Sequence, residues 1–363
     1  MGTLRLSLSY YHCPHCGASS KPWDEQLGLS AQALTPAAAQ VTSQAGVLTS
    51  FGHASEETLR TMAGLRLSPS TVERTTEDAG RRVAQRLAAG QTSGPRASWS
   101  WQRDACGRTC AYISVDATGV RQQGPGGARC DGRMASVGMV YNPRSEHDQR
   151  RPPRRQVRYL SGFYDLDELG RQLRREAEAV GVMDADQQIA LSDGGAGLET
   201  LLRTFFPRAV CILDFWHAKE YLVELAQALF AADEAARTAW LDQACHQLKH
   251  EGGARVLARL EALDLSGRDA AVHEVHRRTV GYYRNHARRM DYPTYVANGW
   301  QIGSGPVESA CKTVVNNRLA GGGMRWGSDG ADAVCHLRAL YLSEPNCWQT
   351  LWQPAALQTH LQI

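Results

Sequence analysis

The sequence predicts an α/β protein whose mixed β-sheet is interrupted by a long, all-helical insertion. Three observations support this prediction: β-rich runs alternate with amphipathic helices over residues 99–217, residues 218–297 have helical periodicity, and a glycine turn opens a further helix within 298–352. The chain has 363 residues, of which 43% are hydrophobic. It is therefore long and apolar enough to bury a large core, and a mainly disordered protein is excluded.

The N-terminal segment, residues 1–29, is predicted to contain a short strand and a metal-binding turn. Leu4–Tyr11 alternates apolar and polar residues, as a strand does. Cys13 and Cys16 then form a Cys-x2-Cys knuckle, which can place two thiolates on one zinc ion. The candidates for the missing ligands are His12, His15, Cys106 and Cys110. The alternative is a pair of free cysteines in a turn.

Residues 30–89 are predicted to be helical, with a helix–turn–helix arrangement over His53–Thr76. Thr35, followed by proline, is a good start for the first helix of the region. Gly64 lies near the end of one helix of the pair, and Ser68 caps the next. Two short helices joined by a glycine turn can read DNA, although most helix pairs do not. The sequence therefore predicts an HTH-like DNA-binding region.

After a linker at Gly90–Ser98, strands and helices alternate up to residue 217. Strands are predicted at Ala111–Asp116, Ala135–Tyr141, Gln156–Phe163, Gln188–Leu191 and Ala209–Leu213, and helices at Asp165–Val180 and Gly197–Phe206. This order predicts an antiparallel start and a parallel continuation of one sheet. It matches a ribonuclease-H-like (RNase H-like) sheet, in which the first and fourth strands are neighbours.

Three acidic residues are the candidate catalytic and metal-binding groups. Asp116 ends the first predicted strand, Asp193 follows the fourth, and Glu308 opens a helix after a glycine turn. Neighbouring first and fourth strands would bring the two aspartates together. Carboxylate oxygens are the ligands that Mg²⁺ prefers, and two ions can serve phosphodiester chemistry. The alternative for each acid taken singly is a turn former or a helix cap.

Asp214 and His217 form a second candidate group, because a histidine follows a strand-end aspartate by one helical turn. The pair could orient an ion-bound water or contact a displaced DNA strand near the active site. The alternative is that Asp214 caps a helix and His217 is an ordinary surface or core residue.

Basic residues are clustered, although the net charge is only +3. The predicted phosphate contacts are Arg150, Arg151, Arg154 and Arg155 in one loop, with Lys312, Arg318 and Arg325 following Glu308. A second cluster comprises Arg277, Arg278, Arg284, Arg288 and Arg289. Local basic patches on a nearly neutral chain suggest a polyanion as partner. Solvated surfaces, or charge balance for the three acids, are the alternatives.

Several motifs together resemble those of bacterial insertion-sequence DDE transposases, in the ISKra-type group with a Mutator-like core. The motifs are Ser114–Val120, Ser192–Gly194, Asp214–Leu222, Ile302–Ser309 and Arg318–Trp326. The resemblance spans residues 4–352 and implies an RNase H-like core interrupted by a helical insertion. It implies that Asp116, Asp193 and Glu308 hold two Mg²⁺ ions, with Mn²⁺ as a substitute.

The resemblance also implies DNA strand cleavage and strand transfer. The expected partners are the terminal inverted repeats of the element, target DNA and further copies of the chain in a synaptic complex. The absence of a bilayer-spanning apolar run or a signal peptide predicts an intracellular protein with no membrane partner. The resemblance implies that it lies in the bacterial cytoplasm and is associated with the nucleoid. The alternatives are a non-catalytic DNA-binding regulator, an RNase H-like nuclease and an inactive, truncated transposase. A pure binder has no need of three ordered acids.

Overall fold

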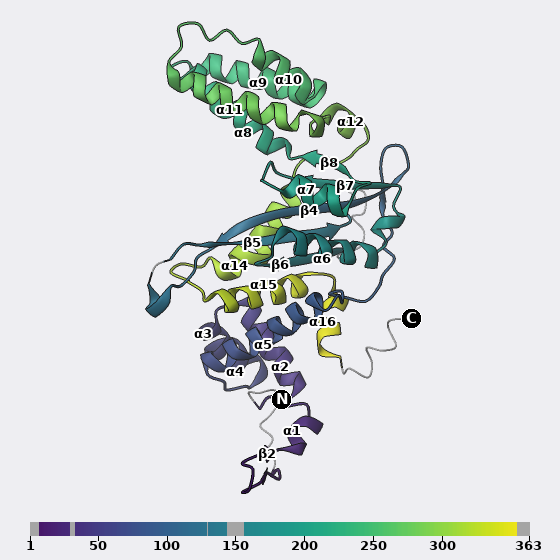
Figure 1. Ribbon diagram of the computed structural model, residues 1–363, viewed down its shortest axis with the longest axis vertical. Coiled ribbons are helices and arrows are strands. Elements are labelled where there is room, and N and C mark those ends of the chain that lie inside the picture. Colours follow the sequence, from purple (N-terminus) through teal and green to yellow (C-terminus); the bar gives the residue numbers. More distant parts are fainter. Residues whose placement is uncertain (1–6, 30–32, 129, 144–155, 354–363) are drawn as a thin grey trace.

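The computed structural model describes residues 7–29, 33–128, 130–143 and 156–353. It is elongated, with a small hairpin and helices at one end, a β-sheet in the middle and a helical bundle at the other end (Figure 1). The predicted α/β class with a mixed sheet is confirmed. Within the described ranges, every helix is too short or too polar to cross a bilayer.

The N-terminal segment forms a hairpin instead of the strand predicted at Leu4–Tyr11. That prediction lies partly outside the described residues, and the strand that forms, β1 (Tyr11–His12), pairs with β2 (Ser19–Ser20). The knuckle closes the hairpin, because the Cys13 N–H donates to the Ala18 carbonyl at 2.8 Å. A short helix, α1 (Pro22–Gln26), follows.

The helical region contains helices from Pro36 to Ala88, which lie within the predicted range of residues 30–89. Its elements are α2 (Pro36–Leu48), α3 (Phe51–His53), a π-turn (Ala54–Thr58), α4 (Leu59–Ala63) and α5 (Pro69–Ala88). The hydroxyls of Thr35 and Ser68 accept backbone N–H bonds as N-caps, and Gly64 ends α4 at φ +67°, a left-handed conformation that favours glycine. The predicted helix–turn–helix arrangement is therefore present, and α5 packs against α2 and α15 (Ser328–Leu342).

The central sheet has the strand order β6-β5-β4-β7-β8, with β3 paired to β4. The strands are β3 (Gln102–Arg103), β4 (Thr109–Val120), β5 (Arg133–Tyr141), β6 (Val157–Gly162), β7 (Gln187–Ser192) and β8 (Val210–Leu213). The pairs β4–β5 and β5–β6 are antiparallel, whereas β4–β7 and β7–β8 are parallel. This is the antiparallel start and parallel continuation that the sequence predicts.

Helices cover both faces of the sheet (Figure 1). Alternate side chains of β4, such as Ile113, pack on one face with α6 (Leu166–Ala179) and α7 (Leu198–Phe205). The intervening Tyr112 faces the other layer, which contains Val314 and the helices that follow residue 214. Asp116 and Tyr112 have the same parity along the strand, so the second layer is the one that positions the candidate site.

Residues 215–297 are helical, as predicted. The helices are α8 (Phe215–Leu229), α9 (Glu234–Glu251), α10 (Gly253–Glu261), α11 (Ala270–His286) and α12 (Tyr292–Ala297). The chain then returns to the sheet through α13 (Gly305–Ala310), a π-helix (Cys311–Asn316), α14 (Asn317–Leu319), α15 and α16 (Pro345–Trp352). Buried tyrosines anchor the bundle, since the Tyr292 hydroxyl donates to the Leu213 carbonyl at 3.0 Å.

Candidate active site

The register of β4 and β7 brings Asp116 close to Asp193, which directly follows the last residue of β7. The parallel ladder between β4 and β7 pairs Ser114 with Leu191, and extending this register by two residues on each strand places Asp116 opposite Asp193. The expectation that Asp116 ends its strand is wrong, because β4 continues to Val120 while paired with β5. Asp116 instead lies just beyond the point where β4 and β7 stop pairing.

The loop that carries Asp193 is held by a buried arginine from the helical bundle. Arg289 donates to the Ser192 hydroxyl at 2.7 Å and also reaches the carbonyls of Ser192, Asp193 and Ile212 at 3.3–3.4 Å. Asp193 Oδ1 accepts the Gly195 N–H at 2.8 Å. Arg289 therefore joins the ends of β7 and β8, and its buried side chain is not free for the polyanion that its basic cluster suggested.

Glu308 is brought to the sheet by a turn that is bonded to the end of β8. The Ile302 carbonyl accepts the Phe215 N–H at 2.9 Å. The Ser304 N–H donates to Oδ2 of Asp214, and the Ser304 hydroxyl donates to Oε1 of Glu308 at 2.7 Å. Ser304 thus connects two acidic side chains that are far apart in the sequence, a role that sequence reasoning missed.

Asp214 caps α8, so the helix-cap interpretation of this residue is confirmed. Its Oδ1 accepts the His217 N–H at 2.9 Å and lies 3.5 Å from Nδ1 of the same histidine. Burial acts to raise the pKa of Asp214, but donors on His217 and Ser304 outweigh it and lower the pKa to about 2. Pairing with Asp214 raises the pKa of His217 to about 9. The pair is therefore carboxylate and imidazolium at neutral pH.

A buried cysteine lies among the acids. The Cys311 thiol donates to Oδ2 of Asp116 at 3.3 Å. Burial raises the pKa of Cys311, and the negative charges of Asp116, Glu308 and Asp193 raise it further. Asp116 is therefore bonded to the thiol, and Glu308 and Asp193 are near enough to act on it electrostatically. Cys311 was not among the predicted site residues, although its spacing of three residues from Glu308 on a predicted helix could have indicated it.

Among the described residues, one group of three ligand-type side chains has its atoms within 4.8 Å of one another: Asp214, His217 and Glu308. Asp116 and Asp193 are outside this group. Both oxygens of Asp214 already accept backbone N–H bonds, and its Oδ1 also lies 3.5 Å from Nδ1 of His217. Two ions about 3.5–4 Å apart do not require all their carboxylates to be in contact with one another. We therefore regard Asp214 and His217 as neighbours of the acids that support Glu308.

Among the described residues, no ion pair joins a lysine or arginine to Asp116, Asp193 or Glu308, and the cation that acts on Asp116 is the His217 imidazolium. Asp116 accepts from the Ala117 N–H at 2.7 Å and from Cys311, and Glu308 accepts from Ser304. Burial raises the pKa of Asp116, and the charge of Asp193 raises it further. The hydrogen-bond donors to Asp116 and Glu308 are neutral, so they leave most of the negative charge of the acids in place. The oxygens of these carboxylates are suitable ligands for Mg²⁺ or Mn²⁺.

The predicted phosphate contacts have different environments. Arg150, Arg151, Arg154 and Arg155 lie outside the described residues. Lys312 and Arg325 are exposed. Arg318 is only 2% exposed, so its assignment as a DNA contact is wrong. Its guanidinium lies over the rings of Phe51 and Trp326 and donates to the Gly46 carbonyl in α2, so it joins the helical region to the core.

Acidic partners neutralise the exposed members of the second basic cluster. The ion pairs are Arg277–Glu274, Arg278–Glu224, Arg284–Glu261 and Arg288–Glu199. The nearest charges are therefore of opposite sign, which weakens the case for a polyanion at this surface.

Cys13 and Cys16 are exposed in the hairpin turn. The Cys16 N–H and thiol lower the pKa of Cys13, which favours the thiolate that binds zinc. Within the described ranges, neither cysteine belongs to a group of three ligand-type side chains. His12 is bonded to Ser19 at 3.1 Å, and Cys110 is buried in β4. The structure thus contains two ligands of the predicted zinc site and does not assemble the others.

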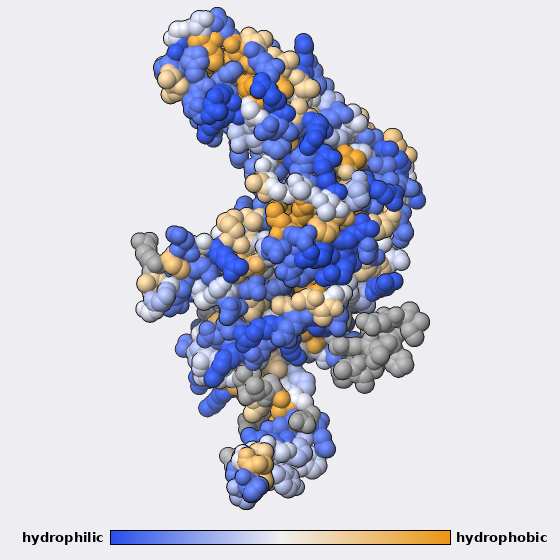
Figure 2. Space-filling model, in the orientation of Figure 1, coloured by the Kyte–Doolittle hydropathy of each residue, from blue (hydrophilic) through white to orange (hydrophobic). Residues whose placement is uncertain are grey.

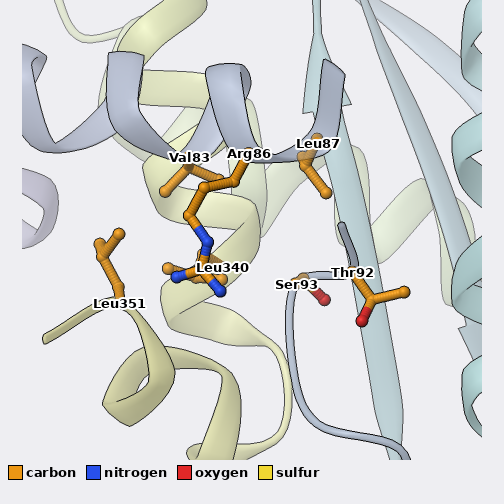
Figure 3. A pocket seen from close by; sticks show the side chains of 7 residues that line it. All are labelled: Val83, Arg86, Leu87, Thr92, Ser93, Leu340 and Leu351. Atoms are coloured by element: carbon orange, nitrogen blue, oxygen red, sulfur yellow. The ribbon is translucent and has the colours of Figure 1, made fainter. Parts of the chain in front are cut away.

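A pocket elsewhere in the fold is lined mainly by apolar side chains. Val83, Arg86, Leu87, Thr92, Ser93, Leu340 and Leu351 surround it, between α5, α15 and α16 (Figure 3). No carboxylate lines it, and Arg86 reaches across it to the Thr350 carbonyl at 3.3 Å. We do not assign the chemistry to this pocket.

Comparison with known proteins found no matching family model and no matching curated protein.

Proposed function

We propose that the chain is the DDE transposase of an insertion sequence, which binds the ends of its element and carries out DNA strand cleavage and strand transfer. The observation that supports this most strongly is the registered position of Asp116 beside Asp193, with Glu308 close to the same thiol. The motif resemblance to the ISKra-type group with a Mutator-like core gives the same three residues.

The strand order supports an RNase H-like core. Three antiparallel strands, β6-β5-β4, continue into the parallel strands β7 and β8, with α6 and α7 as connections. Carboxylates at the ends of the central strands are where such a fold places its chemistry. The helical segment that follows β8 lies between Asp193 and Glu308 in sequence, and the chain returns to the sheet after it.

Asp116, Asp193 and Glu308 would hold two Mg²⁺ ions, or Mn²⁺ in their place. Such ions supply activation of a nucleophile and stabilisation of the leaving oxygen in phosphodiester chemistry. The protein orients the three carboxylates: Arg289 fixes the loop of Asp193, Ser304 holds Glu308, and Cys311 donates to Asp116. Burial and the charge of Asp193 raise the pKa of Asp116, and the nearby His217 imidazolium opposes part of this rise.

DNA is the proposed partner, as terminal inverted repeats and as target. One side of the molecule is hollowed between the helical bundle and the β4–β5 hairpin, where a duplex could lie (Figure 2). The exposed Lys312 and Arg325 follow Glu308 in the chain and are suitable for phosphate contacts. The helical region 36–88 and the loop at 150–155 are further proposed contacts, and we expect a homo-oligomer in the cytoplasm, associated with the nucleoid.

We also propose that Cys13 and Cys16 contribute two thiolates to a Zn²⁺ site, because the hairpin turn gives Cys13 a lowered pKa. Metal analysis of gently purified protein tests this, and a zinc content near zero would leave the knuckle as a plain turn.

The function is tested with DNA that carries the sequences flanking the gene. Purified protein and end-labelled DNA are incubated with Mg²⁺ or with EDTA, and cleavage and joined products are measured. We expect Mg²⁺-dependent cleavage at the element ends, followed by joining to a second duplex. Cleavage without joining would favour an RNase H-like nuclease, and specific binding without cleavage would favour a DNA-binding regulator or an inactive copy.

A further inference from the structure

Cys311 lies on a π-helical segment that runs along β4 beside the acids. The segment spans Cys311–Asn316 and follows α13 directly. Its two ends contact the strand: the Cys311 thiol donates to Asp116 at 3.3 Å, and Asn316 Oδ1 accepts the Thr118 hydroxyl at 3.1 Å. Asp116 and Thr118 are two residues apart, so they lie on the same face of β4.

The π-helical geometry makes both contacts possible. In an α-helix, residues five positions apart point about 140° away from each other around the axis. The i→i+5 bonding of a π-helix brings such residues close to one face, and π-turns are frequent at functional sites. Arg338 stabilises the irregular segment, because its buried guanidinium donates to the carbonyls of Thr313 and Val314.

We propose that Cys311 is a positioning residue that holds the Asp116 carboxylate in its metal-binding orientation. This inference depends on the proposed metal site. Asp116 Oδ1 is already fixed by the Ala117 N–H, and the thiol fixes Oδ2. Among the described residues, the Cys311 thiol is the only donor to Oδ2, so its removal leaves that oxygen without a protein partner.

A thiol suits this position for a physical reason. A lysine or arginine there would neutralise the carboxylate and compete with a metal ion, and a further acid would add repulsion. A neutral donor orients the carboxylate and leaves its charge for the cation. The side chain is 6% exposed, so water replaces it poorly when it is removed.

Mn²⁺ alone, added to the full-length protein, is the probe for this role. Free Mn²⁺ is measured by electron paramagnetic resonance during a titration, and no DNA or turnover is needed. We expect Cys311→Ala to weaken Mn²⁺ binding by about three- to tenfold, as for the loss of one orienting hydrogen bond. Cys311→Ser, which restores a donor, should recover most of the affinity.

Cys335→Ala is the matched control. Cys335 is also a buried thiol, but it lies in α15, beside Ser161 and away from the acids. The Cys335→Ala variant should bind Mn²⁺ as the parent does, even if its thermal unfolding midpoint falls. Parental affinity in Cys311→Ala, or equal loss in Cys335→Ala, would overturn the positioning role while leaving the metal site intact. If the parent does not bind Mn²⁺ and Asp116→Asn behaves in the same way, the metal site itself is overturned, and the positioning role of Cys311 with it.

Discussion

The Ser304 hydroxyl donates a 2.7 Å hydrogen bond to the Glu308 carboxylate, four residues further along the chain. The same serine is fixed through its N–H by Asp214, which caps the first helix of the bundle. The orientation of the third acid therefore depends on the aspartate of the Asp-x2-His motif, although that aspartate need not bind a metal itself.

Ser304→Ala should weaken metal-dependent cleavage. The change removes the donor that orients Glu308, which corresponds to about 1 kcal/mol. We expect the Mg²⁺ concentration for half-maximal cleavage to rise by about three- to tenfold, with most activity recovered at saturating Mg²⁺. Ser309→Ala is the control, because Ser309 is exposed on the same helix. An unchanged Mg²⁺ requirement in Ser304→Ala would show that the bond does not orient Glu308.

The stability of the fold should depend on pH through His217. Its pKa rises from 6.5 to about 9 beside Asp214, so the folded state binds this proton more tightly than the unfolded state does. The stabilisation is complete below pH 6.5 and is lost as the pH rises through 9. Because the side chain is 35% exposed, we expect a contribution of about 1–2 kcal/mol.

Urea unfolding at several values between pH 6 and pH 9.5 measures this effect. The free energy of unfolding should fall across the range in the parent and fall less in His217→Gln. Equal pH dependence in the two proteins would mean that the Asp214–His217 ion pair does not contribute.

Lys312 and Arg325 should contribute to DNA affinity through phosphate contacts. Replacing both with alanine should reduce the slope of log affinity against log salt by about 0.9 for each lost contact on duplex DNA. The control is Arg277→Ala with Arg278→Ala, because acidic partners already neutralise both arginines. The opposite result would place the DNA on the helical bundle instead: an unchanged slope of log affinity against log salt in the Lys312 and Arg325 variant, with a reduced slope in the control.

Arg318→Ala should destabilise the fold. The buried guanidinium lies on two aromatic rings and donates to the Gly46 carbonyl at 2.9 Å. Its loss should lower the free energy of unfolding by about 2–4 kcal/mol. Chemical denaturation measures this change. A stable Arg318→Ala protein with weakened DNA binding would instead restore the phosphate contact that the sequence suggests.

Much of the fold could be predicted because local patterns determine it. Alternation and helical periodicity give the strands and helices, and caps such as Ser68 give their starts. The adjacency of β4 and β7, which brings Asp116 close to Asp193, follows from the order of the strands. These features depend on residues close together in the sequence or on general rules of chain connection.

The remaining features depend on contacts between distant segments. Asp116 lies inside its strand because the β4–β5 hairpin continues beyond the parallel ladder, which no local signal in β4 shows. Arg318 looks like any exposed arginine until Phe51 and Trp326 are placed around it. Cys311 reaches Asp116 through a π-helix, a geometry that helical periodicity does not predict.

The most direct test of the account is cleavage of element-end DNA by Glu308→Gln in Mg²⁺. Glutamine keeps the shape of the side chain and removes the charge that a metal ligand needs, so the cleavage rate should fall by about 100-fold or more. DNA binding should persist, and Asp233→Asn, which can still cap α9, should cleave as the parent does. Cleavage by Glu308→Gln at the parental rate would contradict the assignment of Glu308 and, with it, the three-acid site.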